Sequence, residues 1–319
     1  MRWERLNHVF DPAHHALPDG CVGFAQGPQA VVFDDFVRVY FSTRERDTET
    51  TFRSHVTFVD FEKDLTSIRG TSKRTVIPLG ELGCFDEHGI FPMNVLREGN
   101  RIHAYTTGWN RKRSVSADAS IGYAYSDDDG LTFQKYGSGP VLTASLTEPF
   151  LVCDAFVQKF GQQYHMWYIF GLRWFVDEIE MTPQRVYKIA HAVSEDGINW
   201  ERNGQPIIED RIDANECQAL PSVIRRNDQY LMFFCYRNAS GFRTDKTRGY
   251  RVGCAYSADL KTWTRDDALV PLEVPQGAWD SDMQCYPFAF ECEKEHYLLY
   301  NGNEFGRHGF GVAILKEES

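Results

Sequence analysis

The sequence has no long apolar run and no apolar leader. No window approaches the roughly 18 apolar residues that suggest a membrane-spanning helix, and charges interrupt the N-terminal segment MRWERLNHVF. This pattern argues against a secretory signal peptide and against a membrane span. We therefore expect a cytoplasmic protein without a membrane partner.

Closely spaced cysteine pairs are also missing. The eight cysteines are scattered along the chain without a CxxC motif. Zinc sites and disulfide frameworks usually show such spacing, so we interpret these cysteines as reduced and mostly buried. We predict no metal site and no cofactor, with a central cation as the alternative.

Net positive charge is the third feature that the chain lacks. The formal charge is −11 and the isoelectric point is near 5.4. Proteins that bind nucleic acid or anionic membranes need a basic face for phosphate contacts, so a nucleic-acid partner is not expected. Aromatic residues, in contrast, are abundant, with 23 Phe, 15 Tyr and 7 Trp, which favours a β-rich core.

Five segments share one template, in which an apolar strand and a short polar turn precede a second strand rich in Tyr and Phe. The second strands read VRVYF, IHAYT, YHMWY, YLMFF and YLLYN, and they begin at Val37, Ile102, Tyr164, Tyr230 and Tyr297. These starts are 65, 62, 66 and 67 residues apart. Repeats of about this length with alternating apolar residues are typical of propeller blades. We predict an all-β protein that forms a single five-bladed β-propeller domain over residues 1–319.

A third strand and a tight turn recur in AYSDDDGLTF, AVSEDGINW and AYSADLKTW. The first of these resembles the Asp-box of sialidase-type propellers, which is a turn that stabilises the fold. The tripeptide WER stands after the second of these turns and again at Trp3 to Arg5, whereas the fifth repeat ends after its third strand. We therefore predict that the N-terminal strand closes blade five.

The innermost strands can be aligned on five equivalent positions, namely Pro28, Pro92, Ala155, Pro221 and Pro287. Five residues earlier stand Gly23, Glu87, Phe150, Glu216 and Asp282. Directly before the aligned position stand Gly27, Phe91, Asp154, Leu220 and Tyr286. We expect Glu87, Asp154, Glu216 and Asp282 to converge on the axial funnel, where mutual repulsion and burial would create an acid and base pair. Binding of a cation or capping of strand ends is the alternative.

This constellation resembles the five-bladed glycoside hydrolases of the arabinanase, xylosidase, invertase and levansucrase group. VCDAFV resembles the blade-three motif of that group, and the resemblance implies a tuning role for Asp154. NECQALP resembles the Glu-Cys motif of invertase-like members and implies that Glu216 is the general acid. Parts of blade five also resemble glycosidase-like proteins associated with polysaccharide synthesis.

Blade one departs from the family pattern, because Gly27 stands before Pro28 where the family has an Asp. Three alternatives follow from this departure. Asp282 or Glu87 acts as the base, or the scaffold performs another transfer reaction such as phosphorolysis, or the propeller binds glycans without catalysis.

The long loops on the funnel side carry more Lys and Arg than Asp and Glu, whereas the rest of the chain is acidic. This distribution favours an anionic small-molecule or oligosaccharide substrate that Arg side chains hold. The residues that we predict to bind it are His88, Trp109, Arg173, Gln218, Arg243, Arg248, Gln284, Asn301 and Arg307. The sequence thus predicts a carbohydrate-active enzyme that cleaves or transfers a glycosyl group.

Overall fold

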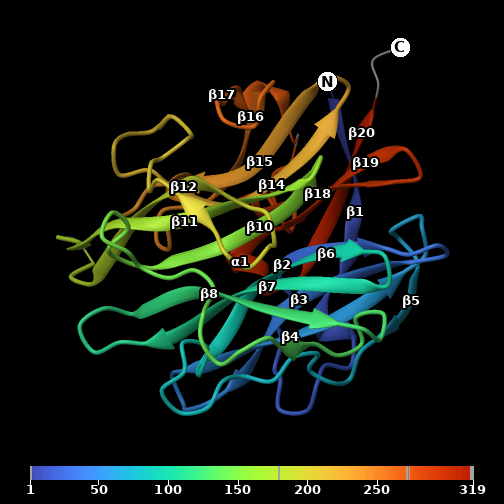
Figure 1. The fold of residues 1–319 in the computed structure, drawn as a ribbon, viewed down its shortest axis with the longest axis horizontal. Helices are drawn as coiled ribbons and strands as arrows, with labels where there is room; N and C mark the ends of the chain where they lie inside the picture. Colours follow the sequence, from blue (N-terminus) through green and yellow to red (C-terminus); the bar gives the residue numbers. More distant parts are fainter. Residues whose placement is uncertain (1, 179, 271, 273, 317–319) are drawn as a thin grey trace.

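The computed structural model describes residues 2–178, 180–270, 272 and 274–316, and this part of the chain folds into twenty β-strands with only short helical turns (Figure 1). The predicted all-β class is confirmed. None of the described helices is long and apolar enough to cross a membrane.

Most strands belong to four-stranded antiparallel sheets that follow one another along the chain. One sheet contains β10 (Val152–Phe160), β11 (Gln163–Val176), β12 (Pro183–Ser194) and β13 (Glu201–Arg202). The next contains β14 (Cys217–Arg226), β15 (Gln229–Arg237), β16 (Arg251–Ser257) and β17 (Thr264–Arg265). Their strand order matches the repeat template, with the aromatic-rich strand second in each sheet.

The N-terminal half forms two similar groups of strands. The first comprises β2 (Gln26–Val32), β3 (Val37–Arg46), β4 (Phe52–Phe61) and β5 (Ile68–Thr71). The second comprises β6 (Gly89–Glu98), β7 (Arg101–Arg111), β8 (Ala117–Ser126) and β9 (Gln134–Lys135). A parallel bridge between Ser54 and Gly89 joins the two groups into one larger sheet.

The remaining sheet combines both ends of the chain. It contains β18 (Cys285–Cys292), β19 (Glu295–Asn301), β20 (Phe310–Lys316) and β1 (Arg2–Phe10), with β1 on its outer edge. Trp3 lies opposite Leu315 and Arg5 lies opposite Ala313 in the antiparallel register. The predicted pairing of Trp3 to Arg5 with the third strand of the last repeat is therefore confirmed.

Each innermost strand (β2, β6, β10, β14 and β18) has a register shift at the position that the sequence alignment made equivalent. Asp154, Leu220 and Tyr286 adopt a left-handed backbone conformation there, as does Gly27. A bulge of this kind bends the strand and redirects one side chain. The alignment of the inner strands, derived from prolines and an alanine, thus marks a real structural repeat.

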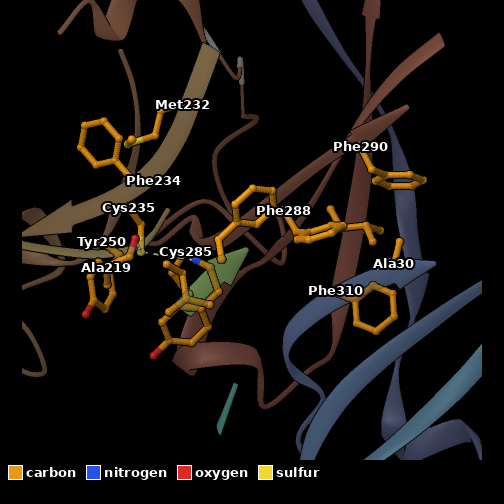
Figure 2. Packing of buried hydrophobic residues seen from close by; sticks show 14 of the residues in the cluster. Ala30, Ala219, Met232, Phe234, Cys235, Tyr250, Cys285, Phe288, Phe290 and Phe310 are labelled. Carbon is orange, nitrogen blue, oxygen red and sulfur yellow. Dashed lines mark hydrogen bonds between the residues drawn. The ribbon is translucent and has the colours of Figure 1, made fainter. Parts of the chain in front are cut away.

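Aromatic rings fill the space between the sheets. Figure 2 shows Phe288 and Phe290 of β18 near Ala30 of β2 and Phe310 of β20, so the last sheet packs against the first. All eight cysteines are unpaired, and six of them are buried. This agrees with their interpretation as reduced core residues.

The recurring Asp turns are structural, as the sequence predicted. Asp196 accepts hydrogen bonds from the backbone N–H groups of Ile198 and Asn199, both at 2.8 Å. Asp259 accepts equivalent bonds from Lys261 and Thr262 at 2.9 and 2.8 Å. These bonds lower the pKa of Asp259 to about 2, so its ionised form stabilises the turn.

Candidate functional site

A cavity of about 740 Å³ opens among the inner strands, and residues at four of the five bulges line it. Phe91, Asp154, Leu220 and Tyr286, which the sequence alignment made equivalent, all line it. Asp154 is the one carboxylate in this set. The bulges therefore direct one acidic and three apolar side chains into the same space.

The equivalent position in the first sheet has no side chain. A Cβ atom on Gly27 would lie 3.1 Å from Cε2 of Phe91 and 3.2 Å from Cβ of Pro92. Its φ of 59° is close to the 56° and 57° of Asp154 and Tyr286 at the equivalent positions, so the close contacts and not the backbone conformation set Gly27 apart. A side chain at this position of β2 would therefore press on Phe91 and Pro92.

Asp154 is buried, with 7% of its surface exposed. Its backbone N–H donates a 2.7 Å hydrogen bond to Oγ1 of Thr107. Burial raises the pKa of its carboxyl group to about 7, although a backbone hydrogen bond from Leu220 and the charge of Arg185 oppose the rise. A carboxyl group with this pKa exchanges its proton near neutral pH, as a general acid must.

Six arginines and three carboxylates line the cavity. The carboxylates besides Asp154 have partners of their own, because Asp118 pairs with Lys112 and Glu304 pairs with Arg307. Four of the arginines form no ion pair with a carboxylate among the described residues, namely Arg44, Arg185, Arg237 and Arg243. The site therefore carries an excess of positive charge.

Arg237 is the most buried of these arginines, with 3% exposure. Its Nη2 donates a 2.8 Å hydrogen bond to the hydroxyl of Tyr187, and its guanidinium carbon lies 3.5 Å from the ring centre of Phe242. Tyr187 in turn hydrogen-bonds to Tyr250. Nε of Arg237 is buried and has no hydrogen-bond partner within the described part of the chain, and a buried unpaired donor is unfavourable unless a ligand satisfies it.

Three of the predicted binding residues lie at the cavity. Trp109, Arg243 and Arg307 line the cavity. His88 stands behind Trp109, with ring centres 6.1 Å apart, and does not itself line the cavity.

Other predicted residues have structural partners instead and are absent from the cavity lining. Among the carboxylates, Glu87 accepts a hydrogen bond from the backbone of Gly83, and Asp282 pairs with Lys246 at 2.6 Å. The expected convergence of four carboxylates on one funnel is therefore not found.

The remaining polar side chains are held in the same way. Asn301 joins its strand to the first sheet through Ala25 and Gly27, and Arg173 binds Asn215 at the surface. Arg248 lies beside Asp245, Gln218 contacts Glu216, and Gln284 contacts the backbone of Asp280.

Glu216, predicted as the general acid, is completely buried and does not line the cavity. Its Oε1 lies 2.6 Å from Nη1 of Arg265, and its Oε2 accepts hydrogen bonds from the backbone N–H groups of Arg211 and Ile212 at 2.9 and 3.0 Å. These partners occupy both carboxylate oxygens and shield the side chain from ligands.

The pair of Glu216 and Arg265 is one of four equivalent pairs. In each, a buried acid that precedes an inner strand meets a base on the outer strand, and the pairs are Asp86 with Lys135, Glu148 with Arg202, Glu216 with Arg265, and Asp280 with Arg5. The base always stands two residues after an aromatic residue, as in the WER tripeptides. Glu216 thus belongs to a set of contacts that repeats from sheet to sheet.

Sequence reasoning counted Arg44, Arg185 and Arg237 among the basic residues of the funnel-side loops but did not name them as binding residues. A signal for two of them exists, because Arg44 and Arg237 stand seven residues after the start of their second-strand motifs, as do Trp109 and Glu304. All four residues line the cavity. No group of three or more His, Cys, Asp or Glu side chains suited to a metal ion occurs among the described residues.

Full-length relatives of the chain are found among curated proteins. The chain is 30% identical over 324 residues to the uncharacterized protein MT1551 of Mycobacterium tuberculosis strain CDC 1551, and the match covers 99% of this chain and 100% of that protein. Rv1502 of strain H37Rv matches to the same extent. A 118-residue match to a β-1,2-mannobiose phosphorylase of Thermoanaerobacter sp. strain X514 is 31% identical and covers 35% of this chain and 37% of the enzyme. No protein-family model matches the chain.

Solved structures share the fold over almost the whole chain. A glycoside hydrolase superposes with a TM-score of 0.75 at 17% identity, covering 99% of this chain and 93% of its own. The β-1,2-mannobiose phosphorylase from Listeria innocua superposes with a TM-score of 0.71 at 12% identity, covering 99% and 97%. The chain therefore has the β-propeller-like fold of these carbohydrate-active proteins.

Proposed function

Because the chain belongs to one family with the mycobacterial proteins MT1551 and Rv1502 and has the fold of glycoside hydrolases and mannoside phosphorylases, we propose that it is a carbohydrate-active enzyme that transfers a glycosyl group. The cavity at the bulges of the inner strands is its active site. The observation that carries this proposal is that a single buried carboxyl group shares the cavity with four unpaired arginines.

In this proposal the sheets form one five-bladed propeller domain over residues 1–319. β1 closes the ring, and the ion pair of Arg5 and Asp280 at 2.6 Å supports this arrangement. Asn301 adds support, because its side chain hydrogen-bonds to the backbone of Ala25 and Gly27 at 2.7 and 2.8 Å. β1 thus supplies the last sheet with the fourth strand that consecutive segments supply in the sheets of β10 and β14.

Asp154 is the general acid in the proposed reaction. Its raised pKa keeps a large part of the group protonated near neutral pH. Hydrolysis by the usual mechanism also needs a second carboxylate. Glu216 cannot reach the cavity in this arrangement, so we assign it a structural role and do not assign it the acid role that the family resemblance implied.

An anionic nucleophile removes the need for a protein base. Inorganic phosphate attacks as an anion without losing a proton first, and arginine forks are suited to hold it. We therefore favour phosphorolysis over hydrolysis. A phosphate oxygen forms a bond to the anomeric carbon while the glycosidic C–O bond breaks, and Asp154 transfers its proton to the departing oxygen. The products are a glycosyl phosphate and a shortened saccharide, and the single displacement inverts the anomeric centre.

The experiment that tests this proposal compares turnover of a disaccharide panel with and without inorganic phosphate. Phosphorus NMR should show a new sugar 1-phosphate signal, and Asp154→Asn should lower the rate about 10² to 10⁴-fold. Arg248→Ala serves as the matched control, because Arg248 is exposed and absent from the cavity lining. Equal sugar release in both buffers would identify a hydrolase, and binding without turnover would identify a glycan-binding propeller.

A further inference from the structure

Arg44 and Arg243 line the cavity with guanidinium nitrogens that have no partner among the described residues. Nε of Arg44 donates a 3.0 Å hydrogen bond to Gln26, while its two terminal nitrogens form no hydrogen bond with any described residue. The side chain of Arg243 is exposed and forms neither an ion pair nor a hydrogen bond in the described part of the chain. We call these two residues the outer pair.

Arg185 and Arg237 form an inner pair around the ring of Tyr187, with guanidinium carbons 5.9 and 5.4 Å from its centre. Arg185 is half-buried and donates a hydrogen bond to Ser116, whereas Arg237 is buried with an unpaired Nε. The charge of Arg185 also acts on Asp154. The inner pair is therefore the one beside the proposed general acid.

The surroundings of the two pairs differ in part. The ring of Phe242 is shared, because it lies 3.5 Å from the guanidinium carbon of Arg237 and 4.3 Å from that of Arg243. The half-buried rings of Phe24 and Phe305 lie 4.2 Å from the guanidinium carbon of Arg44 and 5.9 Å from that of Arg243, and aromatic faces of this kind pack against the apolar faces of sugar rings. The inner pair adjoins the hydroxyl groups of Tyr187 and Tyr250. The outer pair is thus suited to a charged sugar, and the inner pair to a small anion.

The charges of the cavity leave room for more than one anion. Four guanidinium groups line it without carboxylate partners among the described residues, and Asp154 is neutral when it is ready to act as the acid. One phosphate dianion at the inner pair would balance two of these four charges, so Arg44 and Arg243 stay available for a second anionic group.

We propose that the cavity binds two anions together, with inorganic phosphate at the inner pair and a carboxylate or phosphate group of the glycan at the outer pair. This inference rests on the proposed function and specifies its substrate class, which is an acidic saccharide. The group at the outer pair takes no part in bond breaking. It positions the glycosyl unit for attack and distinguishes acidic glycans from neutral ones.

Calorimetric titration of the intact chain tests this assignment with glucuronate, glucose 6-phosphate, glucose and inorganic phosphate as probes. At least one acidic sugar should bind about tenfold or more tightly than glucose. It should still bind when inorganic phosphate is saturating. The two acidic sugars distinguish a carboxylate from a phosphate group at the outer pair.

Three single variants separate the two pairs. Arg243→Ala should weaken binding of the preferred acidic sugar about 10 to 100-fold and leave phosphate binding nearly unchanged. Arg185→Ala should instead weaken phosphate binding and leave binding of the acidic sugar nearly unchanged. Arg248→Ala, also an exposed loop arginine but absent from the cavity lining, should change neither.

The inference is overturned if the acidic sugar and phosphate compete for one site, or if Arg243→Ala leaves the affinity for the acidic sugar unchanged. Equal binding of glucose and both acidic sugars would overturn it as well. In each of these results phosphate still binds, so the proposed function survives. If neither phosphate nor any sugar binds the unaltered protein, the proposed function itself fails.

Discussion

Oε1 of Glu216 lies 2.6 Å from Nη1 of Arg265, and both side chains are buried. This pair joins the start of the inner strand β14 to the outer strand β17. Equivalent acid and base pairs stand in three other sheets. The residue that most resembled a catalytic acid in the sequence is therefore held in a contact that secures one sheet across its width.

Glu216→Ala should destabilise the protein by about 3 kcal/mol, because the buried Arg265 keeps only Asp267 as an acidic partner and the backbone N–H groups of Arg211 and Ile212 lose their acceptor. The measurement is chemical unfolding of both proteins. Turnover per folded molecule should change little, since Glu216 does not line the cavity. Unchanged stability together with lost turnover would contradict the structural role.

Arg5→Ala should lower the stability of the last sheet by a similar mechanism. Asp280, its partner at 2.6 Å, is completely buried, so we expect a loss on the order of 3 kcal/mol. Arg2→Ala in the same strand is the matched control, because Arg2 is exposed. It should change stability by less than about 0.5 kcal/mol. Equal effects of the two variants in thermal unfolding would argue against closure by β1.

Asp154→Asn should stabilise the protein above neutral pH. Burial raises the pKa of Asp154 to about 7 in the folded state, so the folded form binds this proton more tightly than the unfolded form does. The stability that this proton provides is complete below about pH 4 and is lost as the pH rises through 7. The free energy of unfolding of the variant minus that of the unaltered protein should be greater at pH 8 than at pH 4, by about 4 kcal/mol at most. Chemical unfolding of both proteins at the two pH values measures this difference.

Asp259→Asn provides a control of opposite sign for that experiment. Backbone hydrogen bonds lower the pKa of Asp259 to about 2, so its stabilising effect is present above about pH 4 and is lost as the pH falls through 2. This variant should therefore be less stable than the unaltered protein at pH 8. If both variants shift stability in the same direction, the environment inferred for Asp154 is wrong.

Gly27→Ala should cost more stability than Gly99→Ala. Both glycines have a φ near 60°, but a Cβ on Gly27 would press on Phe91 and Pro92, whereas one on Gly99 meets nothing within 4 Å. The left-handed backbone should cost about 1 to 2 kcal/mol at each site, and crowding should add about 1 to 3 kcal/mol at Gly27. If both variants lower the unfolding midpoint equally, the side chains of Phe91 and Pro92 can move aside and the crowding inferred at Gly27 is wrong.

The repeat could be predicted because local patterns determine it. Alternating apolar residues and recurring Asp turns are properties of short segments, and they gave the strand order and the equivalent inner positions. The WER tripeptide at Trp3 likewise predicted the pairing of β1 with β20. Asp154 was found in the same way, since it is the one acid at a bulge position where the equivalent residues are apolar or Gly.

The roles of individual charges could not be predicted, because they depend on partners that are distant in the sequence. Glu216 meets Arg265 49 residues away, and Asp280 meets Arg5 275 residues away. A charged residue has the same sequence signature whether it pairs in the core or faces a ligand. The sequence by itself determined the strands, the turns and the position of Asp154. The tertiary structure alone decided which charges are paired and buried and which arginines remain free around the cavity, because pairing depends on distances between strands that only the folded chain fixes.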